Sequence, residues 1–216
     1  MTVPAELFGC WQRQWIEFAD RTRDDTSFVV WLQLPSLMAD VRLSAAALAL
    51  AGRSSFSLDE LRVLAESDSS SGATTCTPVV QGGATAEWSV AVCFQPTSAF
   101  PEPGLLEWLS DGTVMTERAS SGAYVEERHL PDGSRGPLSH SVLTVGPEWF
   151  RAGSVGVLVR DRPVPLPSVA RLTDLADRAS LKAAIDCEFS FCRLVNDAWT
   201  IEHSTRPARV GAFVQV

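Results

Sequence analysis

The stretch "WLQLPSLMADVRL" (residues 31–43) decides how we read the fold. Its side chains alternate on either side of a Pro-Ser pair, which predicts two short β-strands joined by a tight turn. Residues two apart in a strand share a face, so Trp31 lies with Gln33, and Asp40 lies with Arg42. We expect these polar-bearing faces to point inward, beside the indole.

The same alternation runs through most of the chain, in short segments separated by turn signals such as Asn-Asp and Asp-Gly. This pattern is typical of antiparallel strands in a barrel or a sandwich. Helical periodicity is limited to Ser57–Glu66, where Ser57 and Glu60 form a capping-box pattern, and to Ser168–Ala184. The stretch Ser67–Gly83, rich in Ser, Thr and Gly, is predicted to be a loop.

The two helical segments suggest an internal repeat. The sequence "LDELRVLAES" from Leu58 aligns with "LTDLADRAS" from Leu172, and "GCWQRQW" near the N-terminus aligns with "GAYVEER". Each half would then contain several strands and one short helix. We therefore expect a mainly β chain of two tandem antiparallel barrel halves, residues 1–118 and 119–216, packed tightly on each other.

Composition and charge narrow the class of partner. The 216 residues are 45% hydrophobic and 20% charged, an ordinary balance for a globular protein. The net charge of −8, from 18 basic and 26 acidic side chains, argues against nucleic acid or membrane as partner, because both bind basic surfaces. The sequence contains no apolar run of transmembrane length and no signal-peptide pattern, so we expect a cytoplasmic protein.

The sequence offers no motif for a metal or a cofactor. Its five cysteines form no CxxC pair, and we expect reduced, mostly buried thiols. His129, His140 and His203 have neither HxH nor HxxxH spacing, which argues against a histidine metal site. Glycine pairs do not follow a strand and open a helix, as a dinucleotide fingerprint requires. We therefore predict neither a metal nor a cofactor.

The polar-bearing strand faces are the candidate site. A closed barrel of about eight strands has an interior that holds packed side chains or one small ligand. Aromatic walls with a few convergent polar groups are typical of a small-molecule pocket. A structural alternative stands beside each residue, as plain core or as a weak surface ion pair. The side chains that alternation assigns to ligand binding are Trp31, Gln33, Asp40, Arg42, Tyr124 and Trp199.

The opening stretch also belongs to an ordered set of motifs. "GCWQRQWIEF…DDTSFVVWLQLPSLMADVRL" is followed by "WSVAVCFQP", "YVEER", "CEFSF" and "WTIEHSTRP". This set resembles a poorly characterised bacterial and fungal family (Hri-type proteins), whose yeast member is named as an interactor of a casein-kinase-I homologue. The resemblance implies a calycin-like architecture with two tandem β-barrel halves, and it carries over no established reaction.

Three functions follow from these residues. The first is the binding of a small, largely apolar or aromatic organic molecule, with Arg42, oriented by Asp40, holding a carboxylate or carbonyl oxygen. The second is a cofactor-independent cyclase or isomerase, for example in natural-product biosynthesis. In it Glu126 or Glu117 is the acid or base, since apolar burial raises a carboxyl pKa, and Arg42 or Gln33 is the oxyanion donor. The third is a protein-interaction module, as the name of the yeast relative suggests.

Overall fold

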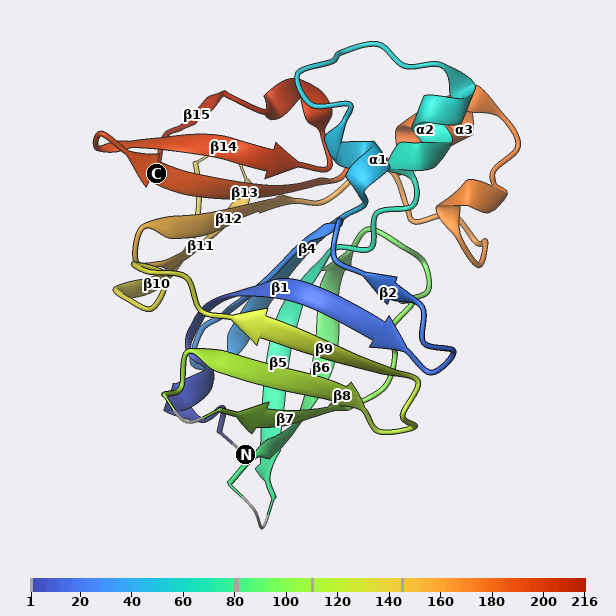
Figure 1. Cartoon of the computed structure of the whole chain (residues 1–216). Coiled ribbons are helices and arrows are strands. Elements are labelled where there is room, and N and C mark those ends of the chain that lie inside the picture. Colours follow the sequence, from blue (N-terminus) through green and yellow to red (C-terminus); the bar gives the residue numbers. More distant parts are fainter. Residues whose placement is uncertain (1, 80–81, 110, 145) are drawn as a thin grey trace.

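The computed structural model describes residues 2–79, 82–109, 111–144 and 146–216. Its strands form two antiparallel sheets (Figure 1). The first sheet contains β1 (Gly9–Phe18), β2 (Arg23–Asp24), β3 (Phe28–Gln33), β4 (Leu37–Leu43), β5 (Ser70–Pro78), β6 (Ala84–Cys93), β7 (Gly104–Trp108), β8 (Val114–Ala119) and β9 (Tyr124–His129). The second contains β10 (Leu138–Val142), β11 (Glu148–Ala152), β12 (Val155–Arg160), β13 (Glu188–Val195), β14 (Ala198–Ser204) and β15 (Phe213–Val214).

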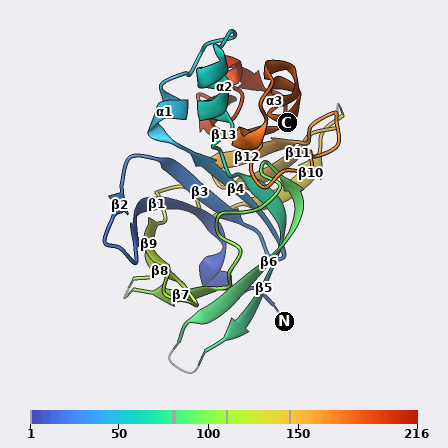
Figure 2. The same cartoon turned by 90° about the vertical axis from the view of Figure 1, so that its right-hand side faces the viewer.

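The first sheet closes into a barrel. Its strand order is β2-β1-β3-β4-β5-β6-β7-β8-β9, and β1 also pairs with β9. Figure 2 shows β1, β9, β8 and β7 curving around one side of the interior and β4, β5 and β6 around the other. The mainly β class and the first predicted barrel are therefore confirmed. β9, which follows the predicted boundary at residues 118/119, completes this barrel, and the chain passes to the second sheet between β9 and β10.

β3 and β4, which contain most of the opening stretch, are buried on both faces. Trp31 pairs with Asp40 across these strands, which places both side chains on the barrel interior. The alternate residues, such as Leu32 and Val41, belong to a core that includes Phe150 and other residues of β11–β13. A slip of one residue would exchange the two faces, so burial on both sides fixes the register.

The second sheet covers the barrel wall, and its strands in the described residues do not close into a barrel. One of its faces packs on the outer side of β3 and β4. Its edge strands β10 and β15 do not pair with each other in the described part of the chain, so the second predicted barrel is not confirmed. The face that would line a second barrel is already packed on the first one, and β15 is only two residues long.

Three short α-helices lie together outside the barrel, beside the second sheet (Figures 1 and 2): α1 (Ala45–Leu48), α2 (Leu58–Leu64) and α3 (Arg178–Ala184). The remaining helical turns are of the 3-10 type: η1 (Ala5–Leu7), η2 (Leu172–Asp174) and η3 (Pro207–Arg209). α2 begins at the predicted capping box of Ser57 and Glu60. The second predicted helix forms only in part, as η2 and α3. No helix in the described ranges is long and apolar enough to cross a membrane.

The predicted loop at residues 67–83 is wrong, because Ser70–Pro78 form β5 and pair with β4 and β6. Residues 80 and 81 lie outside the described ranges. Small side chains suit this strand: a Cβ at Gly72 would meet the carbonyl oxygen of Ser89 at 2.0 Å. The register of β5 and β6 shifts at this point, between Ser71 and Gly72, so the glycine permits the close approach of β6.

Candidate functional site

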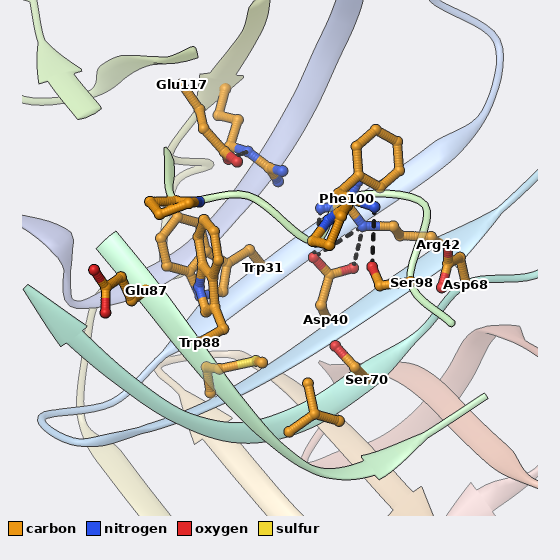
Figure 3. A pocket seen from close by; sticks show the side chains of 15 residues that line it. Trp31, Asp40, Arg42, Asp68, Ser70, Glu87, Trp88, Ser98, Phe100 and Glu117 are labelled. Carbon is orange, nitrogen blue, oxygen red and sulfur yellow. Dashed lines mark hydrogen bonds and ion pairs between the residues drawn. The ribbon is translucent and has the colours of Figure 1, made fainter. Parts of the chain in front are cut away.

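A cavity of about 300 Å³ opens within the barrel (Figure 3). Its wall comes from β3, β4, β5, β6, β8 and β9, and from the segment between β6 and β7. Four predicted residues line it, namely Trp31, Asp40, Arg42 and Glu117. The inward faces of β3 and β4 therefore meet at this cavity, as their alternation predicts.

Aromatic side chains form the apolar wall. Trp31 and Trp88 meet edge to face, with ring centroids 5.6 Å apart. The rings of Phe100 and Tyr124 meet edge to face, with centroids 5.2 Å apart. The Arg42 guanidinium lies 4.4 Å from the centre of the Phe100 ring. Phe100 belongs to the segment after β6, so this segment covers the charged side of the cavity (Figure 3).

Asp40 and Arg42 form a tight pair on β4. Arg42 Nε donates to both carboxylate oxygens of Asp40, at 3.0 and 3.1 Å, and Nη2 donates to Oδ2 at 3.0 Å. Nη1 of Arg42 donates to Glu126 Oε1 at 3.4 Å. Burial raises the pKa of Asp40, although the Arg42 guanidinium opposes this shift. Each nitrogen of Arg42 therefore already has a partner within the protein.

Glu126 is the centre of what we call the buried charge cluster, which consists of Arg13, Asp40, Arg42, Glu117, Glu126 and Arg128. Glu126 is fully buried and accepts hydrogen bonds from Arg13 Nη1 at 3.1 Å, from Arg42, and from Arg128 Nη2. Burial opposes the ionisation of Glu126, but the guanidiniums of Arg128, Arg42 and Arg13 outweigh it and hold the pKa below its usual range. Glu126 is therefore a carboxylate near neutral pH.

Glu117 behaves in the opposite way, although it lies directly across from Glu126 on the neighbouring strand. Its Oε2 accepts from Arg128 Nε at 3.0 Å, and its Oε1 accepts from the Tyr124 hydroxyl at 3.2 Å. Burial raises the pKa of Glu117, and the nearby carboxylate of Glu126 adds to this against the attraction of Arg128. Of the two predicted acids, Glu117 is the one that lines the cavity and the one whose pKa burial raises above its usual range.

Gln33 and Tyr124 lie behind the cavity wall. Gln33 Oε1 accepts from Trp31 Nε1 at 3.0 Å and from Thr74 Oγ1 at 2.7 Å, and its amide nitrogen donates to backbone carbonyls. These bonds fix the indole of Trp31, so Gln33 positions the wall rather than facing the cavity. Tyr124 stands between Phe100 and Glu117 in the same supporting role.

The structure does not bring Trp199 to the other predicted residues. Trp199 lies on β14, in a separate apolar cluster on the second sheet. Its ring meets that of Trp149 edge to face at 4.8 Å, and Arg151 lies 5.3 Å from its centre. Trp199 therefore packs the second sheet and takes no part in the barrel cavity.

Arg128 is one of the cavity-lining residues that the sequence reasoning missed. It shares the inward face of β9 with Tyr124 and Glu126, so alternation along "YVEERH" could have found it. Three buried side-chain nitrogen or oxygen atoms have no hydrogen-bond partner in the described residues, namely Ser67 Oγ, Trp108 Nε1 and Arg128 Nη1. Arg128 alone of these three residues lines the cavity. Trp88 and Phe100 were also missed, since no local pattern places them opposite β3.

A second, larger cavity of about 530 Å³ lies between α2, α3 and η3. It is lined mainly by apolar side chains, such as Leu61, Leu64 and Ile185, and it contains none of the predicted site residues. The barrel cavity is the better candidate because buried charged groups converge on it. Among the described residues, no cluster of three or more His, Cys, Asp or Glu has an arrangement suited to a metal ion.

No protein-family model, curated protein or solved structure matches the chain. The likeness to the Hri-type family therefore stays a prediction from sequence motifs. The function of the site is therefore inferred only from its residues and the distances between them.

Proposed function

We propose that this protein binds a small, largely apolar or aromatic organic molecule in the barrel cavity. The observation that carries the proposal is the buried charge cluster beside an aromatic wall. All six side chains of the cluster are at most 15% exposed. Replacing buried ion pairs with apolar residues is often neutral or stabilising, so stability alone gives no reason to keep such a cluster. Binding a ligand that needs oriented polar groups would be a reason to keep the cluster.

The cavity suits a compact ligand. Its volume of about 300 Å³ is at the lower end for small-molecule pockets and fits a molecule of one or two rings. Trp31, Trp88 and Phe100 would contact the rings, since aromatic faces and edges bind apolar bodies with defined geometry. The charge cluster would orient any polar substituent.

A panel of aromatic fragments, followed by ligand-observed NMR and calorimetry, tests this function. Trp88→Ala removes one wall of the cavity and should weaken binding by about tenfold or more. Trp149→Ala, on the second sheet, is the matched control and should leave affinity unchanged. Failure of the whole panel to bind would count against the proposal and favour the protein-interaction module. Equal binding by the Trp88→Ala variant would count against the barrel cavity as the binding site.

A cofactor-independent cyclase or isomerase is the second candidate, and Glu117 is the observation that favours it. Its carboxyl lines the cavity with a raised pKa, as a general acid near neutral pH requires, whereas Glu126 is held ionised behind it. If turnover of a bound molecule is found, Glu117→Gln should retain binding and lose turnover. Turnover that persists in that variant would rule out Glu117 as the acid.

A further inference from the structure

We infer that the molecule held in the barrel carries a neutral oxygen acceptor, such as a ketone or amide carbonyl, which accepts a hydrogen bond from Nη1 of Arg128. This inference rests on the proposed function and specifies the polar group of the ligand. It assigns to Arg128 the role that the sequence alone suggested for Arg42.

Arg128 has a donor nitrogen that no described residue accepts from. Arg128 is fully buried; its Nε donates to Glu117 and its Nη2 donates to Glu126. Its Nη1 has no partner in the described residues, and the side chain lines the cavity. An unpaired buried donor on a charged group is costly, so an acceptor oxygen at this position would be stabilising.

The neighbouring guanidiniums of Arg42 and Arg13 already donate to carboxylates. Every nitrogen of Arg42 donates to Asp40 or Glu126. Arg13 does not line the cavity, and its two terminal nitrogens donate to Glu126 and to Asp24. Of the guanidinium nitrogens of the two arginines that line the cavity, Arg42 and Arg128, only Nη1 of Arg128 has no acceptor among the described residues.

The charged groups around the cavity disfavour an anionic ligand. The buried charge cluster contains three guanidiniums and three carboxyl groups, which pair with one another. The cavity lining adds two more acidic side chains, Asp68 and Glu87. Arg42 and Arg128 already pair with Asp40, Glu117 and Glu126, so a ligand carboxylate would enter without a cation of its own, and a buried charge without its own partner is strongly unfavourable. A carbonyl oxygen accepts the same hydrogen bond and adds no charge.

A series of three isosteric probes tests the inference on the unmodified protein: 2-acetylnaphthalene, 2-isopropenylnaphthalene and 2-naphthoate. The ketone should bind tightest. The alkene, which lacks the acceptor, should bind about tenfold to a hundredfold more weakly, and the carboxylate should also bind more weakly than the ketone. Dissociation constants from calorimetry at fixed pH and salt give the ranking.

The outcomes separate the two proposals. Equal affinities for ketone and alkene would overturn the inference while leaving small-molecule binding intact, because Nη1 would then be served by something else, such as water. Tightest binding by the carboxylate would overturn it as well and indicate an anion site. Binding by none of the three would count against both proposals.

A pair of variants locates the donor. Arg128→Lys keeps the positive charge but loses the forked donor, so it should remove the preference for the ketone. Arg162→Lys changes another buried arginine, which donates to the backbone carbonyls of Ala184 and Phe94 away from the barrel cavity, and should keep the preference. An Arg128→Lys variant that folds and retains the full ketone preference would overturn the assignment. If it does not fold, the probe series on the unmodified protein still decides.

Discussion

Replacing Glu126 by Gln tests whether this carboxylate holds the barrel interior together. Glu126 is fully buried and accepts hydrogen bonds from Arg13, Arg42 and Arg128. A glutamine keeps one acceptor oxygen but turns an amide N–H₂ group toward guanidinium donors, and it leaves three buried positive charges against two carboxyl groups. Breaking a buried ion pair in this way costs about 3–5 kcal/mol. That is a large part of the roughly 5–15 kcal/mol by which most proteins are stable.

Urea denaturation at pH 7, followed by circular dichroism, measures the change in the free energy of unfolding. The same loss should lower the melting temperature by roughly 6–20 °C in a chain of this size. Glu127→Gln is the matched control, because Glu127 is the next residue of β9, points to the opposite face and pairs with the half-exposed His129. We expect the control to change stability by less than about 0.5 kcal/mol. Equal losses in the two variants would refute the reasoning that buried charge, rather than strand position, sets the cost.

Three further predictions concern titration, thiol reactivity and the second sheet. Burial raises the pKa of Glu117, so the folded chain holds a proton that the unfolded chain has released, and stability should fall as pH rises from about 4.5 through that pKa. Glu117→Gln should remove this part of the slope, measured as the difference between the unfolding free energies of wild type and variant across pH; an unchanged slope would contradict it. Burial also raises the pKa of Cys10 to about 12, so the half-buried Cys93 should react first with a thiol reagent in the native protein, and equally fast labelling of Cys10 would be the contrary result. Trp199→Ala should cost about 3–5 kcal/mol in stability while leaving ligand affinity in the barrel unchanged; a lower affinity in the folded variant would speak against the separation of the two regions.

The sequence predicts the interior of the barrel well where alternation is strict. Along residues 31–43 it places Trp31, Asp40 and Arg42 on one face, and the structure brings these side chains together at the cavity. The prediction that polar groups point into the barrel is correct because the apolar residues between them are buried on the opposite, outer face of the strands. Those residues pack under the second sheet, so both faces of the strands are covered.

What the sequence could not predict depends on contacts between distant residues. Barrel closure pairs β1 with β9, more than a hundred positions apart, and no local pattern encodes that pairing. The register shift between Arg13 and Trp15 breaks the alternation of β1, so the side chain that follows on the inside is Ile16 rather than Trp15. β5 is made of small polar residues whose strand conformation comes from its two neighbours rather than from its own propensity.

The two-sided burial of β3 and β4 means that the barrel cannot be separated from the rest of the chain. A fragment ending between β9 and β10 would contain every barrel strand, yet it would expose Val30, Leu32 and Val41 to water across one wall. Such a fragment would aggregate or need the second sheet supplied as a separate piece. The same strands also put Arg42 and Phe150 on opposite sides of a single layer of backbone. A movement of the cavity wall would thus reach the second sheet directly, without passing through a linker or a hinge.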